Sequence, residues 1–154
     1  MKYTVRFAHL KYPSPLRPGT VVYRGEEVGV MGNTGSSSGA HVHLDVVEGA
    51  HTGRYTLGDM AAGSPKPNAK QCVFFADKEL FGVEPEITTH YADPRYYKTL
   101  AKFHFAMDIV PEDRHRTTEH HTLRWPRSMP GTVVRNVEGD PGYGNYVMIT
   151  YEAS

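Results

Sequence analysis

Glycine and proline divide this chain into segments that are too short for long helices. Its 154 residues include 15 glycines and 11 prolines, which separate brief runs rich in Val, Ile, Tyr and Phe. Glycine and proline weaken helix interiors, whereas branched and aromatic residues favour strands. We therefore expect a mainly β fold, an antiparallel sheet or open barrel-like core with long loops and little helix.

The runs also indicate where the elements lie. Alternation across residues 3–10 predicts a strand, and residues 20–24 and 28–31 around Gly25 predict a hairpin. Further strands are expected around His41 and at residues 73–75, 103–110, 131–136 and 145–151, the last two joined by a turn at 140–144. Helical turns are expected at 55–62, inside a surface excursion over 48–68, and at 77–81. Residues 93–102 fit either a loop or a short helix, and residues 112–129 are expected to be irregular.

Length and charge limit the class of protein. A chain of 154 residues has the size of one domain, so we expect a single domain over residues 1–154. Lys and Arg number 17, as do Asp and Glu, which argues against nucleic acid or an anionic membrane as partner. No stretch predicts membrane insertion. The single cysteine, Cys72, excludes an internal disulfide and is expected in the core of a protein folded in a reducing cytoplasm.

Two short segments carry most of the chemistry. His41 and His43 are two residues apart, so a strand places both on one face. His104 and Asp108 also share a parity, and a strand would place them on one side with Ala106 between them. Imidazole and carboxylate groups are common zinc ligands, so these segments together predict a zinc site. The remaining histidines are expected to be ordinary surface or core residues, with adventitious metal binding open to the last two: His51, His90, His115, His120 and His121.

The segments around these residues resemble a known family. Residues 32–45 contain a glycine-rich turn, then H-x-H, an apolar residue and an acid; residues 103–109 contain H-x-x-x-D; and residues 142–149 contain a glycine turn and a strand. With residues 7–10, they resemble the lysostaphin and LytM type of zinc metallopeptidase, which hydrolyses peptidoglycan. The resemblance covers residues 3–47 and 86–151.

The order of these segments is rotated relative to that family. The family has H-x-x-x-D and the glycine-turn strand first, and the H-x-H strand last. Here residues 1–47 hold His9 and H-x-H, residues 86–154 hold H-x-x-x-D, and residues 48–85 connect them. We expect a circularly permuted strand order, with residues 3–10 antiparallel to residues 145–151 and the chain ends adjacent. A monomer is expected, with a strand-exchanged dimer as the alternative.

The resemblance implies a role for each site residue. His43, His104 and Asp108 would ligate one Zn²⁺ per chain, leaving a fourth position open as in catalytic sites. His9 and His41 would flank the attacking water as catalytic residues. Asp45, two residues beyond His43, would either orient that ligand or lie in solvent.

The implied activity is that of a zinc-dependent peptidoglycan endopeptidase, such as a phage endolysin. Family members cut pentaglycine bridges or the D-Ala to meso-diaminopimelate crosslink. The sequence contains no recognisable wall-binding module, which favours the second bond. The partners would be peptidoglycan stem peptides. The N-terminal residues do not resemble a signal peptide, so we expect synthesis in the cytoplasm and action on the wall after release, or as a virion component.

Two alternatives stay open. A catalytically inactive relative could bind peptidoglycan or activate another hydrolase, although such relatives usually lose zinc ligands. A biotinyl or lipoyl carrier domain is suggested by the short strands at residues 17–22 and 27–31, but no lysine follows a methionine at a turn there. Zinc with hydrolysis supports the peptidase, zinc without hydrolysis the inactive relative, and no metal the carrier.

Overall fold

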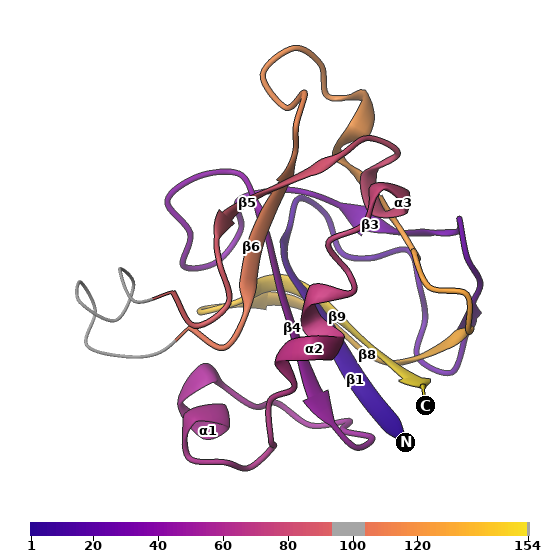
Figure 1. Cartoon of the computed structure of the whole chain (residues 1–154), viewed down its shortest axis with the longest axis vertical. Helices are drawn as coiled ribbons and strands as arrows, with labels where there is room; N and C mark the ends of the chain where they lie inside the picture. The colour runs from indigo at the N-terminus through magenta and orange to yellow at the C-terminus, as the bar shows by residue number, and fades with distance from the viewer. Residues whose placement is uncertain (94–103, 154) are drawn as a thin grey trace.

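The computed structural model describes residues 1–93 and 104–153, and these residues form a mainly β fold, as predicted. The strands are β1 (Lys2–Leu10), β2 (Val21–Val22), β3 (Glu27–Val30), β4 (Val42–Glu48), β5 (Pro85–Thr89), β6 (Met107–Pro111), β7 (Thr122–Arg124), β8 (Gly131–Asp140) and β9 (Gly144–Glu152). The helices are α1 (Leu57–Ala61), α2 (Ala69–Val73), α3 (Lys78–Phe81) and the 3-10 turn η1 (Glu119–His121). An antiparallel sheet has the order β2-β8-β9-β1-β4-β6-β5, and β3 pairs with β7 (Figure 1).

The two ends of the described chain lie side by side. Strand β1 pairs antiparallel with β9 on one side and with β4 on the other. The amino group of Met1 donates to the carbonyl of Ala153 at 3.0 Å, and the Ala153 N–H donates back to Met1 (Figure 1). The predicted pairing of residues 3–10 with residues 145–151 is thus confirmed.

The sheet separates two apolar clusters. Along β4, Val42, Leu44 and Val46 belong to the larger cluster, whereas Val47 belongs to the smaller one on the opposite face. The period-two alternation of a strand therefore directs the polar residues between these positions toward the smaller cluster. Cys72 is fully buried in the larger cluster, as predicted, and its thiol donates to the Leu44 carbonyl.

The predicted hairpin around Gly25 is wrong. Val21 pairs with Thr132 of β8, and Glu27 pairs with Arg124 of β7. Both short strands therefore join partners about a hundred residues away, which buries Val22 and Val28 in the main core. Local alternation identifies such strands but carries no information about which distant edge they complete.

Residues 73–75 are not a strand. Helix α2 begins after Asn68, whose side chain accepts from the Gln71 N–H, a standard N-cap contact. Cys72 and Phe75, three residues apart, are buried on one side, as helical periodicity requires. The helical turns expected at 55–62 and 77–81 are confirmed as α1 and α3.

The strand predicted over residues 103–110 is shorter than expected. Strand β6 begins only at Met107, because the carbonyl of His104 accepts from the N–H of Ala92 and the chain bends before it enters the sheet. Residue 103 and most of the ambiguous segment 93–102 lie outside the described residues. Strand β5, which pairs with β6, was not predicted.

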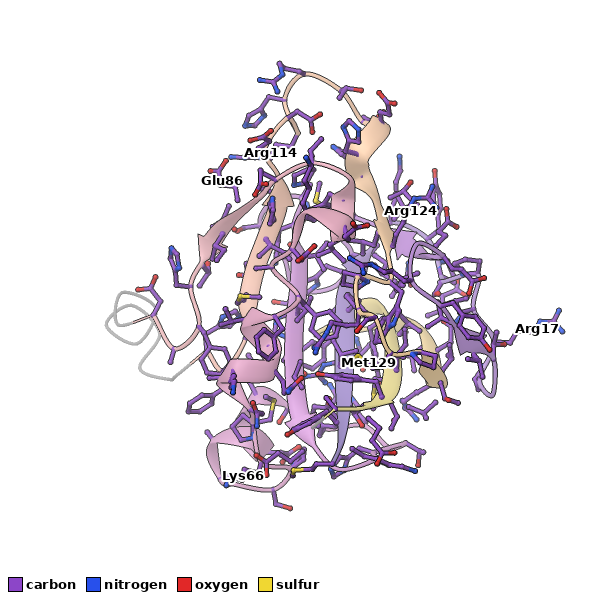
Figure 2. All side chains as sticks on the ribbon, turned by 45° about the vertical axis from the view of Figure 1, so that its right-hand side comes forward. Arg17, Lys66, Glu86, Arg114, Arg124 and Met129 are labelled. Atoms are coloured by element: carbon purple, nitrogen blue, oxygen red, sulfur yellow. The ribbon has the colours of Figure 1, made fainter. Side chains whose placement is uncertain are left out.

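Residues 112–129 are mostly irregular, as predicted, apart from η1 and the unpredicted β7. At the start of this segment, Arg114 forms an ion pair of 2.9 Å with Glu86 of β5 (Figure 2). Within it, His120 Nδ1 lies 2.6 Å from Asp113 Oδ2. Among the described residues, no helix has the length and hydropathy needed to cross a membrane.

Candidate metal centre and its pocket

Strand register brings together two of the three candidate ligands, His43 and Asp108, whereas His104 lies just before β6. Ala8 of β1 is paired with His43 of β4, and His43 is paired with Asp108 of β6. Directly paired residues on antiparallel strands project from the same face, so these three form a row across the sheet. The site therefore combines strands from both segments that carry the histidine motifs.

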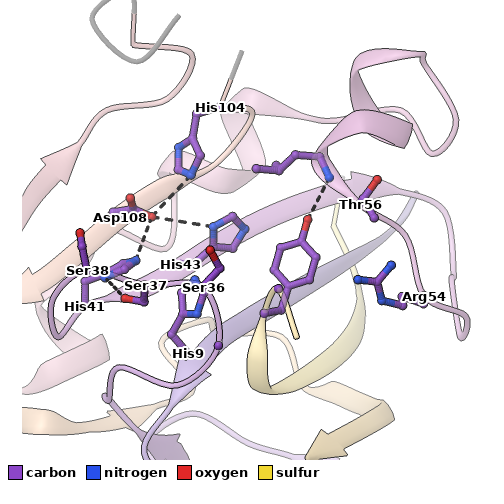
Figure 3. A pocket seen from close by; sticks show the side chains of 14 residues that line it. His9, Ser36, Ser37, Ser38, His41, His43, Arg54, Thr56, His104 and Asp108 are labelled. Atoms are coloured by element: carbon purple, nitrogen blue, oxygen red, sulfur yellow. Dashed lines mark hydrogen bonds and ion pairs between the residues drawn. The ribbon is translucent and has the colours of Figure 1, made fainter. Parts of the chain in front are cut away.

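Three side chains converge closely enough to hold a metal ion. His43 Nδ1 lies 3.8 Å and His104 Nε2 lies 3.6 Å from Asp108 Oδ1 (Figure 3). The three donor atoms all lie within 4.8 Å of one another. Ligands bound tetrahedrally to zinc at about 2.0–2.1 Å would be roughly 3.3 Å apart, so small side-chain movements would complete the site.

The environment of the Asp108 carboxylate indicates a cation-binding site. Asp108 Oδ1 is buried, and within the described residues it accepts no hydrogen bond. A buried carboxylate oxygen without a donor is costly, and a metal ion removes that cost. Burial lowers the pKa of His104 to about 4, so this imidazole is neutral near pH 7 and has a lone pair to offer.

His9 reaches the pocket through a β-bulge. Regular alternation along β1 would place His9 on the same face as Val5 and Phe7, in the larger core. The pairing of β1 with β9 shifts between Phe7 and Leu10, and His9 adopts a positive φ of 62°. Bulges re-aim side chains in this way, and the His9 ring lies 5.0 Å from the His41 ring.

Backbone carbonyls orient both non-ligand histidines. His9 Nδ1 lies 2.6 Å from the Thr34 carbonyl, and His41 Nδ1 lies 2.7 Å from the Gly39 carbonyl. Because a carbonyl only accepts, each Nδ1 carries the proton and each Nε2 is left with a lone pair when the ring is neutral. Burial lowers the pKa of His9 to about 4, so its ring is neutral near pH 7.

All five predicted site residues line one open pocket of about 820 Å³ (Figure 3). The glycine-rich loop contributes Ser36, Ser37 and Ser38, and Arg54 and Tyr143 also line the pocket. Such a volume lies in the range of ligand-binding pockets, so it accommodates a peptide segment as well as water.

Comparison with known protein families, curated proteins and solved structures finds no match to this chain. The chemistry of the site is therefore inferred from its geometry and from the sequence motifs.

The other histidines lie outside this group. His120 contacts Asp113, and His51 Nε2 lies 2.8 Å from the Glu48 carbonyl. Of the residues that the structure describes, only His43, His104 and Asp108 form a cluster of three or more potential metal ligands.

Asp45 is the predicted residue with two open interpretations, and its burial excludes one. Its side chain is fully buried, and Oδ2 lies 2.7 Å from His43 Nε2, so it contacts this candidate ligand and not solvent. Sequence reasoning missed Arg6 and Tyr55, which donate to this carboxylate, and Tyr143, whose ring packs on Arg6. The one signal that could have indicated Arg6 is a charged residue between two apolar ones, Val5 and Phe7, inside a predicted strand.

Proposed function

We propose that this protein is a zinc-dependent endopeptidase that hydrolyses peptide crosslinks of peptidoglycan. The observation that carries this proposal is the arrangement of five side chains around one pocket. Three of them could bind a metal ion, and two histidines beside them keep a free Nε2 lone pair. A purely structural metal site would have four protein ligands and no such neighbours.

The donor set favours zinc. Two imidazoles and one carboxylate suit this ion and leave a fourth tetrahedral position open. Zinc held there would supply a Lewis acid able to activate water and polarise a peptide carbonyl. His43, His104 and Asp108 would hold it, which agrees with the roles that the family resemblance implies.

His9 and His41 would handle protons. With Nδ1–H held by a backbone carbonyl, each neutral ring presents Nε2 as a base that can take a proton from the attacking water. The resulting imidazolium can donate to the oxyanion or return the proton to the leaving amine. His41 Nε2 lies 3.5 Å from Asp108 Oδ1, which places this base beside the candidate ligands.

The substrate class comes from the motifs. The glycine-rich turn, H-x-H and H-x-x-x-D segments resemble peptidoglycan endopeptidases, and β1 pairs with β9 as the rotated segment order requires. We propose the D-Ala to meso-diaminopimelate crosslink as the bond that is cut. An inactive relative is not favoured, because the geometry lacks none of the three ligands.

Digestion of purified sacculi tests this proposal. The protein loaded with one zinc per chain should convert crosslinked muropeptides of a Gram-negative wall into monomers, as measured by chromatography and mass spectrometry. A pentaglycine-bridged wall, digested in parallel, identifies the alternative bond. Chelated protein that is still folded by circular dichroism serves as the control. Zinc-loaded, folded protein that releases nothing from either wall would refute the proposal.

A further inference from the structure

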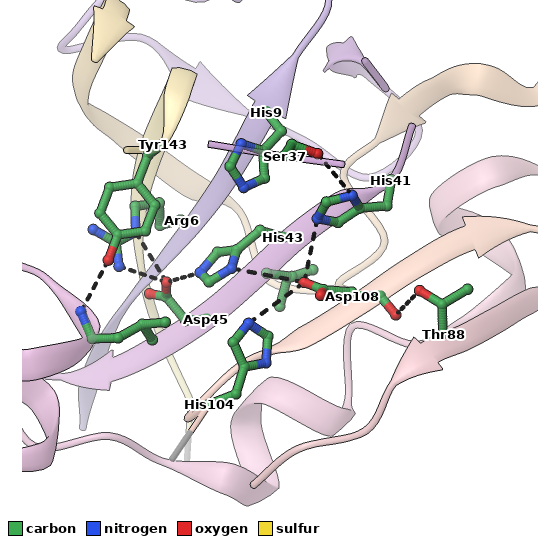
Figure 4. A network of polar contacts seen from close by, with 12 residues as sticks. Arg6, His9, Ser37, His41, His43, Asp45, Thr88, His104, Asp108 and Tyr143 are labelled. Carbon is green, nitrogen blue, oxygen red and sulfur yellow. Dashed lines mark hydrogen bonds and ion pairs between the residues drawn. The ribbon is translucent and has the colours of Figure 1, made fainter. Parts of the chain in front are cut away.

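The strongest polar contact next to the candidate ligands involves a fully buried arginine. Arg6 on β1 is paired with Asp45 on β4, and both side chains have no solvent exposure. Arg6 Nε and Nη2 donate to Asp45 Oδ2 at 2.9 and 2.7 Å (Figure 4). The rings of Tyr55 and Tyr143 lie 4.3 and 3.9 Å from the guanidinium carbon. This cation is therefore held from several sides.

The same carboxylate contacts His43. Asp45 Oδ2 lies 2.7 Å from His43 Nε2, and the Tyr55 hydroxyl donates to Oδ1 at 3.3 Å. Oδ2 also accepts both hydrogen bonds from the fully buried Arg6 guanidinium, and this ion pair holds Asp45 as a carboxylate. An ionised carboxylate only accepts hydrogen bonds, so the proton between the two groups belongs to His43 Nε2.

A neutral imidazole carries one N–H, so this contact decides which nitrogen can bind metal. With the proton on Nε2, the lone pair is on Nδ1, and Nδ1 is the atom that lies 3.8 Å from Asp108 Oδ1. We propose that Arg6 and Asp45 are positioning residues that fix His43 in its Nε2-protonated tautomer, with the Nδ1 lone pair directed at the metal site. This inference rests on the metal site of the proposed function and not on its peptidase activity.

Replacing both residues of the ion pair can separate the positioning of His43 from the stability of the fold. Removing one partner of a buried pair leaves an uncompensated charge and destabilises strongly, whereas replacing both by apolar groups of similar size is often tolerated. The double variant Arg6→Met with Asp45→Leu has no acceptor for His43. The double variant Arg6→Met with Asp45→Asn has the same charge and the same branching of side-chain heavy atoms, but keeps an amide oxygen that can accept from Nε2–H.

Zinc affinity of the full-length chain, stripped of metal and titrated against a chromophoric chelator, distinguishes these variants. We expect the Met/Leu variant to lose roughly 10- to 100-fold in affinity, the usual effect of removing a residue that orients a metal ligand. The Met/Asn variant should recover part of that loss. A purely structural role would weaken both variants equally and would overturn the proposal.

Asp113 provides a matched control. It also holds an imidazole, with Oδ2 2.6 Å from His120 Nδ1, but His120 is not in the metal group. Asp113→Asn should therefore leave zinc affinity within about twofold, against the 10- to 100-fold expected above. A larger loss for Asp113→Asn than for the Met/Leu variant would place the metal elsewhere and refute the proposal.

The tautomer of His43 can also be measured directly in the unaltered chain. Nitrogen chemical shifts of the His43 ring in metal-free protein near neutral pH should show a protonated Nε2 and a bare Nδ1. A protonated Nδ1 would overturn the proposal even if the double variants fail to fold. Neither measurement uses hydrolysis, so absence of wall cleavage would remove the proposed peptidase activity and leave this inference standing.

Discussion

The two sides of the pocket are built from different kinds of structure. On the metal side, His43 and Asp108 are register partners on adjacent strands, and the His43 side chain is only 3% exposed. On the other side, His9 occupies a β-bulge and the His41 side chain, 17% exposed, follows the glycine-rich loop. Strand pairing fixes His43 and Asp108, whereas the positions of His9 and His41 depend on how one loop is anchored.

That loop is anchored close to the start of β9. Thr34 Oγ1 donates to the Leu10 carbonyl at 2.6 Å and accepts from the Asn145 N–H at 3.0 Å. Next to it, a Cβ added to Gly35 would lie 2.3 Å from the Gly144 nitrogen, so only glycine fits this approach. The Thr34 carbonyl, which orients His9, is thus held by contacts outside the pocket.

The largest effect is expected from a change on the metal side. His104→Ala removes one of three protein ligands, so the variant should lose most of its zinc and, with it, wall hydrolysis. Elemental analysis after gel filtration measures the zinc content. His120→Ala is the control and should keep its metal. Full zinc retention in His104→Ala would mean that the ligands lie elsewhere, with His120 and His121 as the next candidates.

Changes to His9 and His41 should affect hydrolysis without affecting metal binding. His9→Ala and His41→Ala should keep zinc and the fold but reduce wall hydrolysis by about two orders of magnitude, the usual scale for general acid–base groups. Zinc content and circular dichroism are measured beside the rate of muropeptide release. If His41→Ala hydrolyses sacculi at the parental rate, His41 only faces the pocket and has no role in proton transfer.

A smaller effect is expected from the loop anchor. Thr34→Val keeps the shape of the side chain but leaves the Leu10 carbonyl and Asn145 N–H without this partner, at a cost of about 1–3 kcal/mol. Hydrolysis should fall by about tenfold, because the Thr34 carbonyl no longer holds His9 firmly. Zinc content should not change. The exposed Thr20 provides the matched Thr→Val control; equal rates for both variants would contradict a role of the loop in aligning His9.

The sequence was most informative where chemistry depends on residues close together in the chain. In H-x-H the two histidines are two residues apart, so a strand places both on the same face whatever its partner strand is. His41 and His43 do line one pocket. His9 is different: alternation predicts the wrong face for it, and only the bulge between Phe7 and Leu10 turns it toward the site. A bulge depends on the partner strand, so residues 3–10 alone could not predict it.

The contacts that Arg6 and Tyr55 make with Asp45 could not be predicted from the sequence for the same reason. Arg6 lies beside Asp45 because β1 pairs with β4 in one register, and a shift by a single residue would turn Arg6 to the other face. Tyr55 comes from residues 48–68, which composition placed at the surface, yet it is only 4% exposed. Polar composition predicts a loop correctly but does not reveal that one aromatic residue of that loop packs under the site.

The smallest expected effect concerns the turn that faces the loop, and it has a pH signature. Asp140 accepts from Arg54 Nε at 2.8 Å and from the N–H groups of Gly142 and Tyr143. The hydrogen bond from Arg54 is the main reason that the pKa of Asp140 is lowered to about 2 from an ordinary value of 3.8. A lowered pKa in the folded state means that the ionised group stabilises the fold above the ordinary pKa, and that this contribution disappears as pH falls toward about 2.

Asp140→Asn should therefore lower the free energy of unfolding by about 1 kcal/mol near pH 7, since Arg54 is partly exposed and solvent screens the pair. The difference from the parent should persist down to about pH 4 and shrink between pH 4 and pH 2, as measured by urea unfolding at several pH values. Arg54→Met in the Asn background should add little further loss, because the charged contact is already gone. A difference that stays constant across this pH range would mean that Asp140 acts only through the shape of the turn. Zinc affinity should be the same in parent and variant, since, among the described residues, the hydrogen-bond partners of the Asp140 side chain are Arg54 and two backbone N–H groups and include none of the candidate ligands.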